Sequence, residues 1–230
     1  MLIKEWMATK ILTVDANTSV MRATRTMKEN KIRRLPVLSH GKLVGIITDR
    51  DLKEASPSNQ ADMDIHEMYY MLSEMKVKDV MSSDPICLNE NDSLEKAALI
   101  MLDKTISGIL ILDDQKSLAG LLSESDVLKG FIHATGIQDG AYQYVMDMQD
   151  KSGSVSILID ILRGHKAHVL SILTSFEDAP AGLKRVAVRI KVEDNEIKPL
   201  TEELSGMKGC SMISHGMDDL SDIVSENSAS

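Results

Sequence analysis

The sequence has few aromatic residues and no excess of positive charge. Phenylalanine, tryptophan and tyrosine make up 3% of the 230 residues, so a platform for stacking nucleic-acid bases is not expected. The formal net charge is −9 and the isoelectric point is about 5.2, which argues against general binding of nucleic-acid phosphates. A local basic pocket for a small phosphate-bearing ligand is still compatible with this balance.

Cysteines and long apolar runs are also scarce. The two cysteines, Cys87 and Cys210, lie far apart and give neither a metal-ligand spacing nor a disulfide framework. No apolar run approaches the ~18 residues that span a membrane, and the N-terminus MLIKEWMATK lacks the apolar core of a signal peptide. We therefore expect a cytoplasmic protein of one large or two small domains, with enough hydrophobic residues (43%) for packed cores.

The sequence does contain an internal repeat. The segment GIITDRDL at residues 45–52 returns, with conservative changes, as GLLSESDVL at residues 120–128. Upstream of these segments, Met7 aligns with Met81 at an offset of 74 residues, and one residue inserted in a later turn raises the offset to 75. A turn is where a single insertion disturbs a fold least.

Each copy of the repeat follows one pattern of predicted elements. A short extended segment and polar capping residues precede a helix, and two strands joined by a polar turn precede a second helix. The first helix of each copy has an apolar stripe with i, i+3, i+4, i+7 spacing, at Val20, Ala23, Thr24 and Met27 and at Leu94, Ala97, Ala98 and Met101. The pattern predicts two βαββα units, at residues 1–58 and 77–135, in an α/β (α+β) fold.

A hydroxyl and a carboxylate stand three residues apart where the last strand of each copy ends. Thr48 precedes Asp51, and Ser123 precedes Asp126. One interpretation is a capping box with a shortened acid, worth ~1 kcal/mol as a helix cap. The other is ligand binding, because a carboxylate can accept both hydrogen bonds of a vicinal diol and a helix start suits a phosphate. Recurrence at matched positions favours the second interpretation.

The repeated segments resemble the CBS domain, and their tandem arrangement resembles a Bateman module. Both segments have a glycine, two apolar residues, threonine or serine, any two residues and then aspartate. IRRLPV at residues 32–37 fits the second strand of the family, and the resemblance covers residues 1–135. It implies that the two units pack through their sheets and leave two clefts for adenine nucleotides.

The resemblance also implies roles for individual residues. The aspartate of each segment would accept hydrogen bonds from ribose hydroxyls, and the threonine or serine would contact ribose or phosphate. Adenine would lie against the first strand of each unit, near Thr13 and Val14 or near Cys87 and Leu88. The predicted ligand-binding residues are Thr13, Val14, Arg33, Arg34, Ile47, Thr48, Asp49, Arg50, Asp51, Cys87, Leu122, Ser123, Glu124 and Asp126.

The two clefts are not expected to be equal. Arg33 aligns with Ser107 and Arg34 aligns with Gly108, so the second copy lacks both guanidinium groups. Because arginine offers a forked donor to phosphate, we expect the cleft of the first copy to bind phosphate more tightly. The alternative is that both arginines are simply solvated. The cleft of the second copy is expected to be weak, empty or used by a ligand without phosphate.

Two segments lie outside these units. Residues 59–76 are predicted to form a linker helix between the copies, after a helix break at SPSNQ, and TDRDLKEASPS is similar to the acetoin-utilisation group of CBS proteins. Residues 217–230 are acidic and rich in serine, which predicts a disordered tail.

The second half of the chain departs from the repeat. Over residues 140–216 the pattern predicts a βαββαβ order, a ferredoxin-like layout, with Pro199 in the first turn of its second helix. This region resembles an ACT domain through DKSG after the first strand and RGHKAHVLSILT after the first helix. The resemblance implies a homodimer and a small amino-acid-like effector bound by Asp150, Gly153 and Ser154. The alternative is that Gly153 serves only the turn.

These features favour a regulatory binding protein over an enzyme. The first half would sense AMP, ADP, ATP or another adenosyl compound, and the second half would dimerise. The alternatives are a dimerisation scaffold with degenerate ligand sites and an enzyme of acetoin metabolism. No Ser–His–Asp order, Gly-rich phosphate loop or metal set is found, since His165 and His168 lack further ligands. We therefore predict no catalytic residue, no metal and no cofactor beyond the nucleotide ligand.

Overall fold

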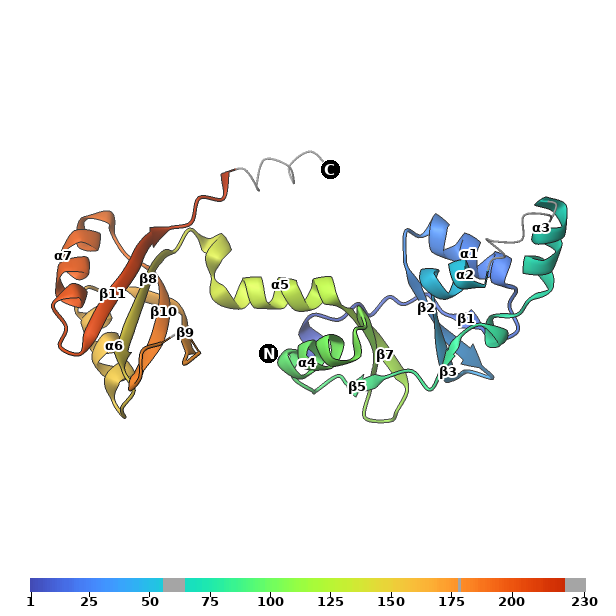
Figure 1. Cartoon of the computed structure of the whole chain (residues 1–230), viewed down its shortest axis with the longest axis horizontal. Helices are drawn as coiled ribbons and strands as arrows, with labels where there is room; N and C mark the ends of the chain where they lie inside the picture. Colours follow the sequence, from blue (N-terminus) through green and yellow to red (C-terminus); the bar gives the residue numbers. More distant parts are fainter. Residues whose placement is uncertain (56–64, 178, 222–230) are drawn as a thin grey trace. The chain divides into compact units, whose positions relative to one another are not determined.

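The predicted alternation of helices and strands is present in the computed structural model, which describes residues 1–55, 65–177 and 179–221 (Figure 1). The chain divides between Gly130 and Phe131 into two units, the first with two sheets and two core clusters and the second with one sheet and one core. Both units combine helices with strands, which confirms the expected α/β class. Among the helices of the described residues, none has the length and apolar character needed to cross a membrane.

The first unit holds both copies of the repeat. The first copy consists of β1 Val14–Asp15, α1 Val20–Glu29, β2 Arg34–Ser39, β3 Lys42–Thr48 and α2 Asp49–Glu54. The second copy consists of β5 Cys87–Asn89, α4 Leu94–Lys104, β6 Gly108–Leu112, β7 Leu118–Ser123 and α5 Glu124–Thr135, of which the part after Gly130 belongs to the second unit. The remaining elements are the 3-10 turns η1 Ile3–Glu5 and η2 Val77–Asp79, helix α3 Ile65–Glu74 and strand β4 Ser82–Ser83. The sheets have the orders β1-β2-β3-β4 and β5-β6-β7.

Several sequence predictions fall partly outside the described residues. The predicted linker helix corresponds to α3, while the predicted helix break at residues 56–60 and the start of the linker lie in the undescribed range 56–64. Of the predicted tail, Met217 closes the last strand, and residues 222–230 are likewise outside the described residues.

The helix caps occur among the polar residues that the sequence predicts just before the first helix of each copy. Ser19 caps α1, and its hydroxyl accepts a hydrogen bond from Arg22 N at 3.4 Å. Ser93 caps α4 in the same way and accepts from Lys96 N at 3.2 Å. Each cap satisfies one backbone donor that the first turn of a helix leaves without a partner.

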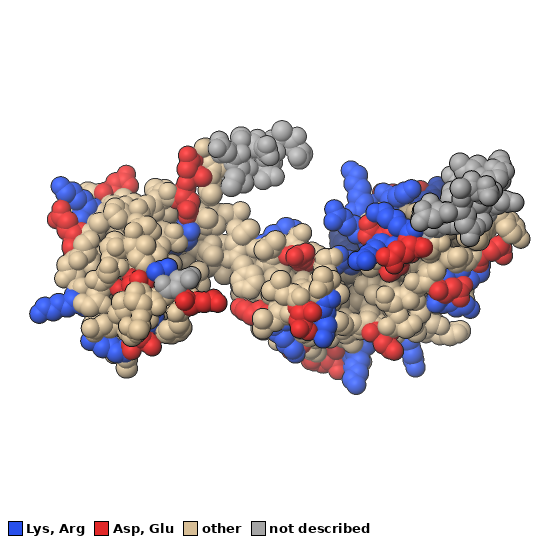
Figure 2. Space-filling view, in the orientation of Figure 1, with Lys and Arg blue, Asp and Glu red and all other residues tan. Residues whose placement is uncertain are grey.

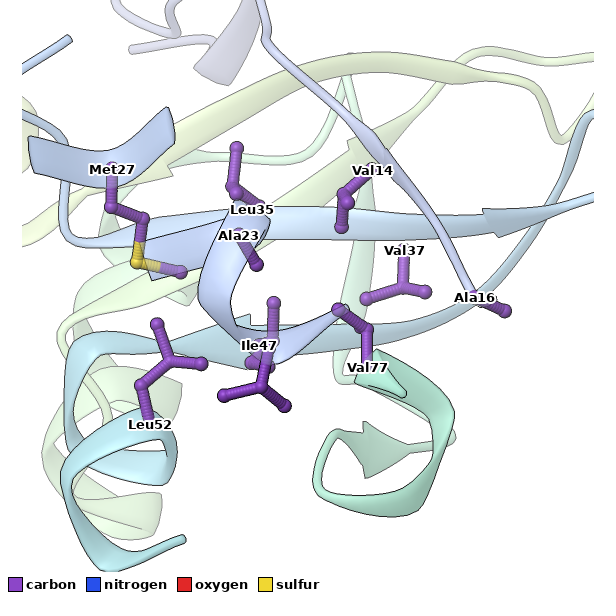
Figure 3. Packing of buried hydrophobic residues seen from close by; sticks show 10 residues of the cluster. Val14, Ala16, Ala23, Met27, Leu35, Val37, Ile47, Leu52 and Val77 are labelled. Carbon is purple, nitrogen blue, oxygen red and sulfur yellow. The ribbon is translucent and has the colours of Figure 1, made fainter. Parts of the chain in front are cut away.

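The apolar stripe of α1 packs against the first sheet (Figure 3). Val20, Ala23 and Met27 are buried, as their spacing predicts. They belong to one cluster with Leu35 and Val37 of β2. Full burial of a side chain of this size stabilises the fold by ~1.5–3 kcal/mol.

Each core also contains a residue from the segment that precedes the other copy. Val77 is fully buried in the first core, where Figure 3 shows it beside the strand residues, and Ile3 is fully buried in the second core. Val77 N donates to Thr18 O at 2.8 Å, and Leu94 N donates to Met1 O at 2.9 Å. The two copies therefore exchange their leading segments, whereas the repeat alignment assigns each segment to its own copy.

The glycine of the repeated signature is required by this exchange. A Cβ atom on Gly45 would lie 2.6 Å from Met81 Sδ and 2.8 Å from Ser82 O. A Cβ atom on Gly120 would collide with the sulfur of Met7. Only glycine lets the leading segment of the other copy approach the strand this closely.

The second unit has the predicted βαββαβ order. Its elements are β8 Tyr142–Gln149, α6 Ser154–Gly164, β9 His168–Ser175, β10 Leu183–Lys191, α7 Asp194–Ser205 and β11 Cys210–Met217, preceded by the 3-10 turn η3 Ile137–Asp139. The strand order is β11-β8-β10-β9 with antiparallel neighbours, so β8 and β9 run parallel on either side of β10. The two helices bury Leu158, Leu162, Leu200 and Leu204 in the core of this unit. The ferredoxin-like layout is therefore confirmed.

The expected position of Pro199 is wrong. Helix α7 begins at Asp194, so the proline lies inside the helix and not in its first turn. Asp194 and Glu196 place negative charge in the first turn, where the helix dipole favours it, and this extends the helix upstream of the expected start. The proline has no N–H to donate within the helix. Helix α7 tolerates the loss of this one backbone hydrogen bond.

The exchange of leading segments predicts that a residue near the N-terminus stabilises the second core. Ile3→Ala should lower the free energy of unfolding of the first unit by ~2–5 kcal/mol, because it leaves a cavity in that core. Urea unfolding of the full chain measures this. The matched control is Leu2→Ala, since the Leu2 residue is 37% exposed. Equal, small effects of the two variants would show that the N-terminal segment does not support the core.

Candidate functional site

Two clefts of similar size lie where the copies of the repeat meet. The first cleft has a volume of about 550 Å³ and is lined by Thr48, Asp49, Arg50 and Asp51 together with residues 82–86 and 105–108. The second cleft has a volume of about 560 Å³ and is lined by residues 10–12, 30–34 and 123–125, with Leu121 and Ser107. The lining positions of one cleft match those of the other at the offsets of the repeat. Each cleft is thus built by both copies.

The repeated hydroxyl and carboxylate of the first copy form a capping box at the start of α2. Thr48 N donates to Asp51 Oδ2 at 2.7 Å, and Thr48 Oγ1 donates to the same oxygen at 2.8 Å. In return, Asp51 N donates to Thr48 Oγ1 at 3.3 Å. Both bonds that the carboxylate accepts use Oδ2, and no group among the described residues bonds to Oδ1 of Asp51. The cap therefore leaves one carboxylate oxygen available in the first cleft.

The second copy repeats the cap but uses its carboxylate more fully. Ser123 N and Ser123 Oγ donate to Asp126 Oδ2 at 3.0 and 2.5 Å. The other oxygen, Oδ1, lies 3.6 Å from Lys129 Nζ. Ser123, Glu124 and Ser125 line the second cleft, whereas Asp126 is not among its lining residues. The two predicted ribose-binding carboxylates therefore have different surroundings.

Arg34 lies between the two clefts and lines both, as does Arg33. Its Nη2 donates to Ser107 Oγ at 2.8 Å, and its Nη1 donates to the carbonyl of Ser107. Burial lowers the pKa of the Arg34 guanidinium, and the nearby carboxylate of Asp49 opposes this shift. Arg33 and Arg34 therefore give the first cleft no advantage over the second, because both clefts share them, and which cleft binds phosphate more tightly stays a prediction.

Gly108 explains why the second copy has no counterpart of Arg34. A Cβ atom on Gly108 would collide with the guanidinium of Arg34, the residue with which it aligns in the repeat. The equivalent positions 34 and 108 thus lie in contact, and there is room for a long side chain at only one of these two positions. The missing arginine is a consequence of packing as well as of any ligand preference.

Other predicted ligand-binding residues lie outside the clefts. Ile47 and Leu122 are fully buried, and Val14 belongs to the first core. Thr13 and Cys87 line a separate cavity of about 920 Å³ beside the hairpin turns. Burial raises the pKa of the Cys87 thiol, which keeps it protonated and unreactive.

The order of the first sheet explains this difference. Strand β2 separates β1 from β3, so the residues around Thr13 do not adjoin the strand that ends at Thr48. Besides β2, the neighbour of β3 is β4, in the leading segment of the other copy. Sequence reasoning missed residues 82–86 and 8–12 as cleft walls, although the repeat alignment pairs these two segments and could have drawn attention to them.

In the second unit, the predicted effector residues surround the start of α6. Gly153 caps the helix with φ +84°, a conformation that favours glycine, so its predicted role in the turn is present. Ser154 is 4% exposed, and its hydroxyl has no hydrogen-bond partner among the described residues. Asp150 Oδ1 lies 3.6 Å from Lys184 Nζ.

His165 forms a contact that the sequence analysis missed. It caps the end of α6, and its Nδ1 lies 2.7 Å from Glu196 Oε2 while its Nε2 lies 2.9 Å from Glu203 Oε2. Hydrogen bonds to Glu196 and then to Glu203 raise the pKa of His165. The ring joins α6 to α7. Among the described residues, no group of three or more His, Cys, Asp or Glu side chains is placed to hold a metal ion.

The fold and the clefts define a class of protein in which a tandem repeat carries a ligand-sized cleft at each of two equivalent places. The family model of the CBS domain matches residues 3–58 and 77–133. The chain belongs to the CBS domain family and contains a tandem pair of these domains. The matched residues end before β8, so the ACT-like character of the second unit stays a prediction.

Curated relatives support this assignment. CBS domain-containing protein DDB_G0289609 of Dictyostelium discoideum is 31% identical over 128 residues, which cover 55% of this chain and 88% of that protein. CBS domain-containing protein YhcV of Bacillus subtilis is 30% identical over 125 residues, covering 54% and 81%. Protein MJ1225 of Methanocaldococcus jannaschii is 33% identical over 129 residues, 54% of this chain but 46% of MJ1225, so the chain matches about half of that relative's length.

Solved structures are similar over the same share of the chain. The acetoin utilization protein AcuB from Vibrio cholerae has a TM-score of 0.50 and 21% identity, covering 60% of this chain and 96% of that chain, which shows a shared fold. The CBS domain pair of protein MJ0100, in complex with 5′-methylthioadenosine and S-adenosyl-L-methionine, has a TM-score of 0.48 and 26% identity, covering 57% and 95%.

The contacts of His165 predict that the stability of the second unit depends on pH. Because its pKa is raised in the folded state, the contribution is fully present below the unfolded pKa of about 6.5 and is lost as pH rises through the folded pKa. His165→Gln should lower the melting temperature more at pH 6 than at pH 9, as measured by calorimetric scans. His168→Gln is the control, and the same loss for His165→Gln at both pH values would contradict the prediction.

Proposed function

We propose that the chain is a regulatory protein that binds adenosyl ligands in the two clefts of its CBS pair. One observation carries this proposal. Asp51 lines the first cleft, uses only Oδ2 to cap α2, and keeps Oδ1 without a partner among the described residues. A ribose offers two adjacent hydroxyl donors, which suit a carboxylate oxygen that can only accept. Helix capping and ribose binding are therefore compatible roles of one side chain.

Each cleft has an exposed apolar side chain at an equivalent position, which supports the binding of the adenine base there. Ile86 is 38% exposed in the first cleft, and Leu12, its counterpart in the repeat, is 44% exposed in the second. Ile46 and Leu121 occupy matching positions on the neighbouring strands. An apolar wall opposite a few polar groups is typical of small-molecule sites, and both volumes lie in the usual range of roughly 300–1,000 Å³.

The proposed role of the second unit is dimerisation, with a small amino-acid-like effector as a further ligand. Its ferredoxin-like layout, the turn at Gly153 and the buried hydroxyl of Ser154 support an ACT-like site at the start of α6. A ligand changes the activity of such a protein only through different affinities for two arrangements. We therefore place the regulatory effect in a change of arrangement and not in catalysis.

The ribose contact can be tested with one hydroxyl of the ligand and one carboxylate of the protein. Asp51→Asn should weaken the binding of adenosine about tenfold or more, because a hydrogen bond to a charged group is worth about 1.5–3 kcal/mol. 2′-Deoxyadenosine lacks one of the two hydroxyl donors. Its affinity should therefore fall clearly less in the same variant. Isothermal titration calorimetry of the full chain measures all four combinations.

The matched control for this experiment is Asp103→Asn, since the Asp103 side chain is 71% exposed and lies outside both clefts. It should leave both affinities unchanged. If Asp51→Asn weakened the binding of adenosine and of 2′-deoxyadenosine equally, Asp51 would not contact the ribose. No binding of any adenosyl compound by the wild-type chain would overturn the proposed function as a whole.

A further inference from the structure

The two clefts differ in charge at positions outside the repeated signature. In the second cleft Lys10 stands where the first cleft has Asp84, and Lys31 stands where it has Thr105. Both lysines are exposed. Beside Arg33 and Arg34, which both clefts share, the second cleft therefore has two basic side chains without a basic counterpart in the first.

The pairing of these charges increases the difference. Neither the Lys10 nor the Lys31 ammonium group forms an ion pair within the described residues, so both are free to attract an anion. The first cleft has Arg50 as its own cation, but Arg50 Nε lies 2.9 Å from Glu54 Oε1. Figure 2 shows basic and acidic side chains interspersed over this part of the molecule, so the local balance of each cleft matters more than the net charge.

The acidic residues are distributed in the opposite way. Asp49, Asp51 and Asp84 line the first cleft, whereas Glu124 is the acidic residue among those that line the second. Carboxylates close to a bound phosphate repel it, and ammonium groups attract it. The shared Arg33 and Arg34 contribute to both clefts and cannot distinguish them.

We propose that the second cleft is the site for a phosphate-bearing adenine nucleotide, and that the first cleft takes adenosyl ligands without a phosphate. This inference rests on the proposed function and reverses the preference expected from the alignment of Arg33 and Arg34 with Ser107 and Gly108. Lys10 and Lys31 are the residues that hold the phosphate. Their ammonium groups act as point charges and tolerate phosphates in more than one position.

Removing the two lysines tests the proposal. In the double variant Lys10→Gln/Lys31→Gln, the affinity for AMP should fall tenfold or more, while the affinity for adenosine should change less than twofold. Calorimetric titration of the full chain with each compound gives both values. The AMP affinity of the wild type should also fall with added salt, since screening weakens charge attraction at an exposed site.

The matched control removes the same charge elsewhere. Lys42→Gln/Lys116→Gln lies outside both clefts, beside the separate cavity at the hairpin turns, and should leave AMP binding within twofold of wild type. An equal effect of the two double variants would mean that net charge alone matters, which overturns the proposal.

The reverse exchange gives a gain that a loss of folding cannot imitate. Asp84→Lys/Thr105→Lys transfers the lysines to the first cleft, and the number of AMP molecules bound per chain should rise from one to two. Lysine suits position 105, because Lys31 has φ +52° and Thr105 has φ +53°. An unchanged stoichiometry overturns the inference.

The outcomes separate the inference from the function on which it rests. If adenosine and AMP bind but Lys10→Gln/Lys31→Gln binds AMP normally, the proposed function stands and the assignment of the phosphate site is overturned. If neither adenosine nor AMP binds to the wild-type chain, both are overturned.

Discussion

The exchange of leading segments between the two copies is the constraint on which the first unit depends. Ile3 and Val77 each fill the core of the other copy, and the chain that follows each of them then runs across a signature glycine. A few residues further on, the same two segments form one wall of each cleft. Core packing and cleft geometry therefore depend on the same stretches of chain. A change that loosened either segment would affect stability and ligand binding together.

The repeated hydroxyl and carboxylate fill a structural and a proposed chemical role at once. The capping box orients Asp51 and fixes its Oδ2, so the carboxylate does not need to be ordered when a ligand arrives. In the second copy the equivalent Asp126 is also held by Lys129. The same local motif thus gives two carboxylates that differ in whether Oδ1 has a partner. The difference comes from Lys129, which lies one helical turn after Asp126.

Much of this architecture could be predicted from the sequence. Helical spacing identified the stripe of α1, and the repeat alignment identified both capping boxes, because these features are local in the chain. The βαββαβ order of the second unit was also readable from strand and turn patterns. Local patterns carry this information because neighbouring residues set helix caps, strand ends and apolar faces.

Features that depend on partners distant in sequence were missed. Ile3 fills the core of a copy distant in sequence, which no pattern around it indicates, and nothing near Ser123 indicates that Lys10 and Lys31 line the same cleft. The contact of His165 with Glu196 crosses 31 residues of chain and joins two helices. The placement of adenine near Thr13 and Val14 followed from the family resemblance, and neither residue lines either cleft.

The meeting of Arg34 with Gly108 has a consequence for how such a protein could arise. Two separate, identical subunits related by a dyad would bring two arginines, or two glycines, to this one place. In this chain the two copies are separate stretches of sequence, so equivalent positions can differ, and here a large residue lies opposite a small one. Divergence of the two copies is thus what allows the two halves to specialise.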